Sequence, residues 1–237
     1  MNLIFDVDGT LTESRQHIDE LFKIELEGLA RENNIYIATG SDYSKTADQL
    51  GTDFLENIVS YSFNCAGNSI WNQGKEIYKN EWDMPEEVLA FLKEELDSST
   101  FIHKTGAHFE DRPGMFNFSI VGRNATPHQR AQYQDYDMRT NERRTMASKL
   151  NNLFSSKYNM SAQVAGTTGF DIFPKGKDKG QILSFFENVP VSFFGDDTAV
   201  GGNDYPLALA ITKRNLPEDK VYPVKSPLET RYLLSLL

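Results

Sequence analysis

The chain of 237 residues is long enough for one large domain or two smaller ones, each with a buried core. Its formal net charge of -10, from 34 acidic and 24 basic residues, disfavours non-specific binding to nucleic acid. The single cysteine allows no internal disulfide, and no apolar run is long enough to cross a bilayer. These features predict a cytoplasmic protein that binds neither nucleic acid nor membrane.

A short apolar run at the start of the chain predicts a strand that leads into the string DVDGTLT. Asp6 and Asp8 then lie at the strand's carboxyl end, because Gly9 and Thr10 favour a turn. Open α/β sheets bind ligands at this edge. Two such carboxylates could divide the labour of phosphoryl transfer, with Asp6 attacking phosphorus and Asp8 moving the proton. The motif DxD by itself would indicate only a solvated turn.

The next stretch predicts a helix over residues 14–33 capped by Ser14, because apolar side chains recur there at helical spacing. A strand over residues 35–39 follows and runs into the turn Thr39-Gly40-Ser41, ahead of a polar helix. Backbone N–H groups and a hydroxyl at a helix N-terminus suit phosphate oxygens. Ser41 or Asp42 could equally serve only as the cap of that helix, and this stretch alone leaves both interpretations open.

The middle of the chain changes character, because residues 100–173 combine runs of strands with polar helices. Strands in runs predict an α+β module inserted into an α/β domain. We expect a core over residues 1–80 and 178–237 and an inserted module over residues 81–177. The last elements expected in the first part of the core are a strand at 57–63 and a hairpin within 67–80. Those expected in the inserted module are a helix from the cap Asp83 to 96, strands within 100–121, a short helix after Thr126, a longer helix at 140–157, and strands at 160–164 and 169–173.

The last quarter of the chain returns to the first pattern. It predicts a helix over residues 177–186, a strand over residues 191–194, the acidic turn Gly195-Asp196-Asp197 and a final helix capped by Ser226. If the strands that end at Asp6 and Asp196 are neighbours, the two carboxylates meet despite their separation in sequence.

Carboxylates of Asp6 and Asp196 that lie close together would predict a magnesium site. Mg²⁺ takes six oxygen ligands, so Asp6 and Asp196 would bind it through their side chains and Asp8 through its backbone carbonyl. The cation would offset the repulsion between a carboxylate nucleophile and a phosphate. Lys179 would orient Asp6 and neutralise the phosphoryl group, although a lysine at a helix start is more often simply solvated.

Four strings in this order resemble the motifs of the haloacid dehalogenase superfamily, whose members mostly transfer or hydrolyse phosphate through an aspartyl-phosphate. They are DVDGTLT, the Thr39-Gly40-Ser41 turn, Lys179 and Gly195-Asp196-Asp197. The resemblance implies a Rossmann-like α/β core with a parallel sheet and an inserted α+β cap. It also implies that Thr39 and Ser41 hold the phosphoryl oxygens.

The inserted module and its surroundings resemble the eukaryotic-type phosphomannomutase family over nearly the whole chain. The most specific strings are FDIFPKGKDK at 170–179 and GGND at 201–204. Further matching strings are RPGMFN at 112–117, VGRN at 121–124, Arg15 after the first motif, and Ser226-Pro227.

The family implies an enzyme that interconverts mannose 6-phosphate and mannose 1-phosphate for GDP-mannose biosynthesis. Mg²⁺ is then the cofactor, a hexose 1,6-bisphosphate the activator, hexose phosphates the partners, and a homodimer through the cap the expected assembly. The catalytic residues would be Asp6, Asp8 and Lys179, and the metal ligands Asp6, Asp8 and Asp196. The substrate-binding residues implied by matching motifs are Arg15, Thr39, Gly40, Ser41, Arg112, Asn117, Arg123, Arg130, Gly169 and Asp171.

Three of these residues, Arg112, Arg123 and Arg130, would bind the phosphate remote from the reaction, because a planar guanidinium binds phosphate bidentately. Asp171 would bind a sugar hydroxyl, with Asn117 close by. Alternatively, the arginines are surface ion-pair partners, an interpretation with most weight for Arg130 on a helical face.

Departures from the family pattern keep other functions open. Gly169 stands where the family has a serine, which removes a hydroxyl from the remote phosphate site, and Cys65-Ala66-Gly67 replaces Glu-Asn-Gly. The turn at residues 166–168 also differs. A sugar-phosphate phosphatase, in which water takes the phosphoryl group from Asp6, is therefore an alternative. A non-catalytic sugar-phosphate binding module is a third function, against which the intact catalytic set argues.

Overall fold

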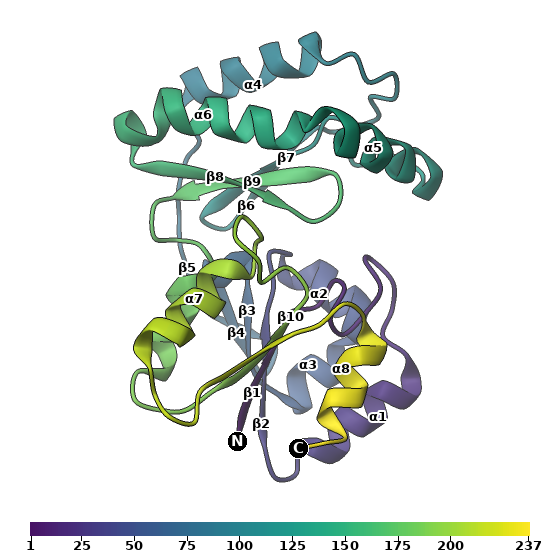
Figure 1. Ribbon diagram of the computed structural model, residues 1–237, viewed down its shortest axis with the longest axis vertical. Helices are drawn as coiled ribbons and strands as arrows, with labels where there is room; N and C mark the ends of the chain where they lie inside the picture. Colours follow the sequence, from purple (N-terminus) through teal and green to yellow (C-terminus); the bar gives the residue numbers. More distant parts are fainter. The chain divides into compact units, whose positions relative to one another are not determined.

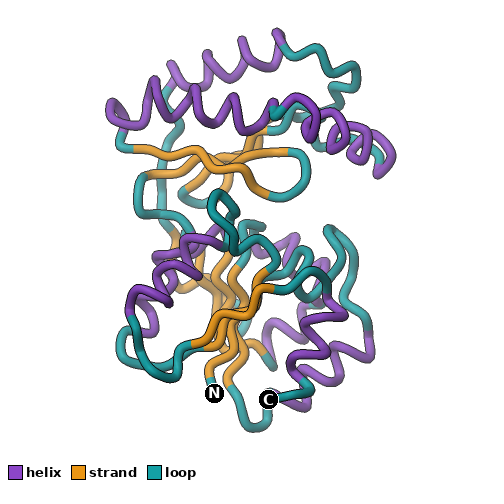
Figure 2. The backbone as a smooth tube through the Cα atoms, in the orientation of Figure 1, coloured by secondary structure: helices purple, strands orange, loops and turns teal.

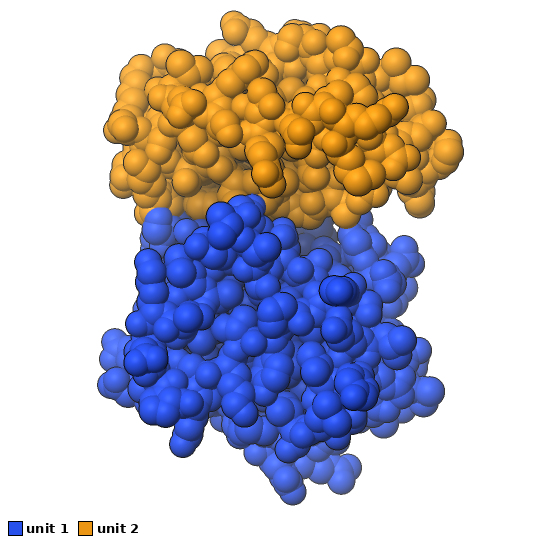
Figure 3. Space-filling model, viewed as in Figure 1, with its two compact units in different colours: residues 1–80, 176–237 blue, residues 81–175 orange.

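The computed structural model describes residues 1–237 and divides them into two compact units (Figure 3). Unit 1 comprises residues 1–80 and 176–237, so it is built from both parts of the chain that flank unit 2, residues 81–175. No helix combines the length and the apolar character needed to span a membrane. Each unit has its own sheet and its own buried core.

Unit 1 is organised around a seven-stranded sheet in the order β11-β10-β1-β2-β3-β4-β5. The first five strands in this order pair in parallel, and β4 and β5 continue the sheet as an antiparallel hairpin. This arrangement confirms the predicted α/β class. The strands are β1 (Asn2–Phe5), β2 (Asn34–Ala38), β3 (Val59–Asn64), β4 (Ser69–Asn72), β5 (Lys75–Lys79), β10 (Ser192–Gly195) and β11 (Lys220–Pro223).

Strand β1 lies inside this sheet and is buried on both faces. Leu3 and Phe5 pack into one hydrophobic cluster, whereas Ile4 packs into another, because successive side chains of a strand point to opposite faces. The first cluster includes side chains of α1 (Glu20–Leu29), α2 (Tyr43–Leu50), α3 (Thr52–Asn57) and α8 (Pro227–Leu234). The second includes side chains of the 3₁₀ segment η2 (Lys179–Phe186) and of α7 (Tyr205–Arg214). Helical segments therefore cover both faces (Figure 1).

The predicted helix over residues 14–33 is wrong in its first turn and a half. Helix α1 begins at Glu20 and is capped by Asp19, whose side chain accepts the N–H of Phe22. The preceding residues form a loop, in which Arg15 has a φ of 61° and its N–H donates to the Asp8 carboxylate. The left-handed backbone at Arg15 and its hydrogen bond to Asp8 are incompatible with a helix that starts at Ser14.

Other expected boundaries also change. The helix expected at residues 177–186 is the 3₁₀ segment η2, capped by Asp178. The helix expected from Asp83 is α4 (Glu86–Ser98), and its N-cap, Pro85, makes no side-chain capping bond. The short helix after Thr126 is in fact 14 residues long. Helix α7 and strand β11 were not predicted.

Unit 2 consists of a four-stranded antiparallel sheet with its helices on one face (Figure 2). Its core joins Phe118, Phe170 and Ile172 of the sheet to apolar side chains of all three helices, such as Leu92 and Leu150. The strands, in spatial order, are β6 (Phe109–Arg112), β7 (Met115–Phe118), β9 (Gly169–Pro174) and β8 (Met160–Ala165). The helices are α4, α5 (Pro127–Thr140) and α6 (Glu142–Tyr158).

A row of polar residues crosses this sheet. Glu110 pairs with Asn117, Asn117 with Asp171, and Asp171 with Gln163, one residue from each strand. Asn117 and Asp171 alternate with the buried phenylalanines of β7 and β9, so the row lies on the face opposite the helices. The apolar alternation of these strands thus positions a polar site on unit 2.

Gly122 and Gly166 of unit 2 both have positive φ, but a side chain would collide with a neighbouring atom at only one of the two. Gly122 has a φ of 79°, and a Cβ there would lie 1.8 Å from the backbone oxygen of Thr105. Gly166 has a φ of 55°, but a Cβ there would have no atom within 4 Å. Gly166→Ala should cost about 1–2 kcal/mol from backbone conformation alone. Gly122→Ala should cost roughly 1–3 kcal/mol more because of the added overlap, measured by urea unfolding. Equal losses would show that contact with Thr105 is not what requires glycine.

Candidate active site

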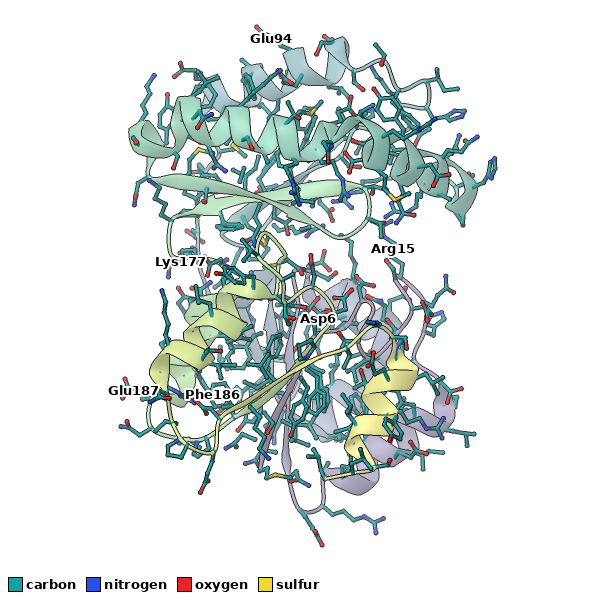
Figure 4. All side chains as sticks on the ribbon, in the orientation of Figure 1. Asp6, Arg15, Glu94, Lys177, Phe186 and Glu187 are labelled. Carbon is teal, nitrogen blue, oxygen red and sulfur yellow. The ribbon has the colours of Figure 1, made fainter.

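A buried ion-pair cluster lies at the carboxyl edge of the unit 1 sheet, where Asp6 follows β1 (Figure 4). The Lys179 Nζ lies 2.5 Å from Asp6 Oδ1 and 2.5 Å from Asp204 Oδ1. All three side chains are almost completely buried, with Lys179 1% exposed. The parallel pairing of β1 with β10 brings Asp196, directly after β10, to the same edge.

The electrostatics of this cluster work against the charged carboxylates. Burial raises the pKa of Asp6 well above its usual value, and repulsion from Asp204 and Asp196 adds to this, while Lys179 opposes it. Desolvation and Asp204 raise the pKa of Asp196 to about 7. Burial also disfavours the charged form of Lys179, but Asp204 and Asp6 together raise its pKa above the ordinary value. The cluster holds more negative charge than Lys179 alone neutralises.

A divalent cation fits this excess of carboxylates. Carboxylate oxygens of Asp6, Asp196 and Asp204 all lie within 4.8 Å of one another. Oxygen-only ligands are those of hard cations such as Mg²⁺, and a bound cation stabilises the ionised form of its ligands. Asp6 and Asp204 are buried whereas Asp196 is exposed, so the group has an open side. The side chain of Asp8 is not a member of this group, and a role for its backbone carbonyl stays a prediction.

Asp204 was missed as a site residue by sequence reasoning. It belongs to the string GGND, which carried the family resemblance, but nothing in that string indicates that its aspartate is fully buried. The fold holds it in place through paired contacts with Asp197. The Asp204 N–H donates to the Asp197 carbonyl at 3.1 Å, and Asp204 Oδ2 accepts the Asp197 N–H at 3.2 Å. This exchange turns the loop after β10 back toward Lys179.

Asp8 is held by a separate set of hydrogen bonds. Its Oδ1 accepts the Arg15 N–H at 2.7 Å and the Gln49 side-chain amide at 3.0 Å. The same amide nitrogen donates to Thr12 Oγ1 at 3.1 Å, and the Gln49 carbonyl accepts the N–H of Ile18. Gln49, at the end of α2, thus fixes both the Asp8 carboxylate and the loop that carries Arg15, a role that its position in the sequence did not reveal.

The predicted phosphate turn follows β2. Ser41 N–H donates to Thr39 Oγ1 at 3.1 Å, and the carbonyls of Thr39 and Ser41 accept the N–H groups of Ala66 and Cys65. Asp42 caps α2 by accepting the N–H of Lys45 at 2.9 Å. The capping interpretation therefore applies to Asp42. Residues 65–67 all have positive φ, so the Cys-Ala-Gly departure from the family pattern leaves a left-handed turn beside Thr39 and Ser41.

A second cluster, which we call the arginine cluster, lies in the polar row of unit 2. Glu110 Oε2 forms an ion pair with Arg112 Nη2 at 2.8 Å and another with Arg123 Nη2. Asn117 donates to Asp171 Oδ1 at 2.6 Å and accepts from Arg123. The side chains of Arg112 and Arg123 are only 7% and 18% exposed, so neither is an ordinary surface ion-pair partner.

Asp171 lies deep in this cluster. Burial raises its pKa, while Arg112, with Nη1 3.7 Å from Asp171 Oδ1, and the hydrogen bond from Asn117 oppose the rise. The cluster therefore combines two cations with carboxylate and amide groups, which are the partners that a phosphate and the hydroxyls of a sugar require.

The remaining predicted residues lie around this cluster. Arg130 donates to Thr167 Oγ1 at 3.0 Å, on the turn that precedes β9. A Cβ at Gly169 would lie 2.7 Å from the Phe118 carbonyl and near the Asn117 side chain, so a serine would not fit without a shift. Arg143, which was not predicted, pairs with Asp137 and donates to the carbonyls of Gly166 and Gly169.

The fold and the acidic site together define a class of protein. The chain matches the C-terminal domain of trehalose-6-phosphate phosphatase from C. albicans with a TM-score of 0.71 and 17% identity, covering 99% of this chain and 90% of that one. It matches a haloacid dehalogenase-like hydrolase from Bacteroides thetaiotaomicron with a TM-score of 0.60 and 15% identity, covering 99% and 98%. These similarities assign the haloacid dehalogenase fold.

Sequence similarity narrows the class further. The model of the eukaryotic phosphomannomutase family matches residues 22–234. Phosphomannomutase of Saccharomyces cerevisiae is 32% identical over 99% of this chain and 93% of its own length, and phosphomannomutase 1 of Dictyostelium discoideum is 34% identical over 99% and 95%. The chain belongs to the eukaryotic phosphomannomutase family, as its motifs predicted, and the family implies metal dependence and hexose phosphate substrates.

The contacts of Gln49 generate a prediction about proton transfer. Gln49→Leu should lower kcat for hexose phosphates about tenfold, because Asp8 loses a hydrogen bond that holds it, a net loss near 1–1.5 kcal/mol. Turnover of p-nitrophenyl phosphate should fall by less than about threefold, since its leaving group needs no general acid. Asp48→Ala, at the exposed neighbouring position, is the control. Equal losses on both substrates would contradict a role in positioning Asp8.

Proposed function

We propose that this chain is a phosphomannomutase that interconverts mannose 6-phosphate and mannose 1-phosphate through an aspartyl-phosphate on Asp6. The observation that carries the proposal is the buried Asp6 carboxylate at the carboxyl end of β1, held by Lys179 at 2.5 Å, in a chain of this family. Lys179 fixes the orientation of Asp6 and supplies positive charge where the phosphoryl group would lie.

The reaction divides into two transfers. In the first, an Asp6 carboxylate oxygen attacks phosphorus of a hexose 1,6-bisphosphate, the bond from phosphorus to the sugar oxygen breaks, and Asp8 gives that oxygen a proton. In the second, Asp8 takes the proton from a hydroxyl of a hexose monophosphate, and the hydroxyl oxygen attacks the aspartyl-phosphate and frees Asp6. The hydrogen bonds from Gln49 and Arg15 keep the Asp8 carboxylate in one orientation for both steps.

The cation in this proposal is Mg²⁺. Asp6, Asp196 and Asp204 would hold it, and it would offset the negative charge of the phosphate and of the carboxylates. Thr39, Gly40 and Ser41, at the end of β2, would donate hydrogen bonds to the phosphoryl oxygens. The contacts of Thr39 and Ser41 with the left-handed turn at residues 65–67 support this role.

The arginine cluster of unit 2 would bind the phosphate that is not reacting. Arg112 and Arg123 provide the charge, Arg130 a further contact, and Asp171 a partner for a sugar hydroxyl. Arg15, in unit 1, stays a predicted substrate-binding residue. At Gly169, the backbone N–H takes the place of the missing serine hydroxyl. A hexose 1,6-bisphosphate activator, a homodimer through unit 2 and a cytoplasmic location belong to the same proposal and rest on the sequence.

A product assay tests the reaction class. The protein is incubated with mannose 1-phosphate, Mg²⁺ and a catalytic amount of glucose 1,6-bisphosphate. We expect mannose 6-phosphate, formed only when the bisphosphate is present, and none after removal of the cation with EDTA. Free phosphate as the main product would assign a sugar-phosphate phosphatase instead. Absence of turnover, with binding retained, would assign a non-catalytic sugar-phosphate binding module.

Substitution of Arg123 tests the remote phosphate site. Arg123→Ala should lower kcat/KM for hexose phosphates roughly ten- to a hundredfold, since a charge-assisted hydrogen bond contributes about 1.5–3 kcal/mol. It should also increase hydrolysis relative to transfer, because water can attack the aspartyl-phosphate when the acceptor sugar is held loosely. Aryl phosphates have no second anionic group and should react almost unchanged. Arg144→Ala removes an exposed arginine of the same unit as the control. A loss shared by both substrate types would indicate damaged folding.

A further inference from the structure

An acidic side chain already binds the two arginines that would bind phosphate. Glu110 Oε2 accepts from Arg112 Nη2 at 2.8 Å, and the same oxygen pairs with Arg123 Nη2. A single oxygen between two guanidinium groups is the arrangement that a phosphate oxygen adopts at an arginine pair. Glu110 is 21% exposed at its side chain, so these contacts are well shielded from water.

The strand geometry fixes Glu110 in this position. Glu110 lies in the polar row beside Asn117, two residues before Arg112, so its side chain and that of Arg112 are on the same face of β6. Asp111, between them, belongs to the other face and is exposed. Asp171 is the other carboxylate near Arg112, but it is farther away, at 3.7 Å, and is held by Asn117.

Binding of a phosphate to this pair is therefore an exchange of anions. The incoming phosphate must displace the Glu110 carboxylate, and when the phosphate leaves, the carboxylate returns, so the arginines are not left as unpaired buried charges. Affinity for phosphate is then the difference between two charge-assisted interactions rather than the full strength of one. A mutase needs such moderation, because the bisphosphate formed in the second transfer must detach and turn before its other phosphate can react with Asp6.

We propose that Glu110 is an internal competitor for the substrate's phosphate and sets how tightly the arginine cluster holds it. The inference rests on the proposed function, since it requires that Arg112 and Arg123 bind a phosphate of the substrate. It adds a residue that weakens binding, and it assigns that residue to the release of the intermediate.

The test compares Glu110→Gln with Asp111→Asn, which removes the same charge one residue away on the opposite face. Mannose 1-phosphate is titrated into each full-length protein by calorimetry, with EDTA present to prevent turnover. Glu110→Gln should bind about tenfold more tightly than the unsubstituted protein, and Asp111→Asn within about twofold of it. In the mutase assay Glu110→Gln should lower both KM and kcat, because release becomes slower, whereas a merely structural defect would raise KM.

Glu110→Asp keeps the negative charge and is the control for a folding defect caused by substitution at this position. It should bind no more tightly than the unsubstituted protein, with an unchanged melting temperature. The inference is overturned if Glu110→Gln binds equally or more weakly while Arg123→Ala also weakens binding, which leaves the proposed remote phosphate site intact. If Arg123→Ala has no effect on binding, the proposed remote phosphate site is wrong, and so is the role of Glu110 that depends on it.

Discussion

The buried contact of Lys179 with Asp6 and Asp204 is the interaction on which the site depends. Lys179 is the cation that accompanies two aspartates in a nearly dry environment, where burial raises the pKa of Asp6 and the charge of Lys179 opposes that rise. Removing one member of such a cluster leaves an uncompensated charge, which is strongly destabilising in buried pairs. The end of β1, the η2 segment and the loop after β10 are therefore held together by ion pairs as well as by packing. The carboxylates outnumber Lys179, so a bound cation would be stabilised beside them.

Much of the fold could be predicted because local patterns and packing agree. The apolar run of β1 and the turn after it identified Asp6 at a sheet edge, and β1 pairs with β10 as the meeting of Asp6 and Asp196 required. The alternation in β7 and β9 likewise identified the strands that carry Asn117 and Asp171. These residues lie on regular elements, whose side-chain directions follow from the periodicity alone.

The rest depends on contacts between distant segments. Helix α1 begins five residues late because Asp8 and Gln49 hold the preceding loop, and neither bond has a local signal. Asp204 and Glu110 looked like ordinary acidic residues, since their importance comes from cations brought close by the fold. At Gly169, the family's serine is absent, which suggested only a lost hydroxyl. The structure gives a packing reason for glycine there, because the Phe118 carbonyl lies too close for a side chain.

The division of unit 1 across the chain has a consequence for folding during synthesis. Asp6 is made before unit 2, but Lys179 follows Asp6 by 173 positions, and Asp196 and Asp204 come later still. Unit 2 is continuous and is complete before any of these partners exists. On the ribosome, unit 2 can therefore assemble first, while β1 to β3 wait for β10 to join the sheet. The ion-pair cluster of unit 1 can consequently form only after all of unit 2 has been made, and a nascent chain can have its arginine cluster in place before Lys179 and Asp204 reach Asp6.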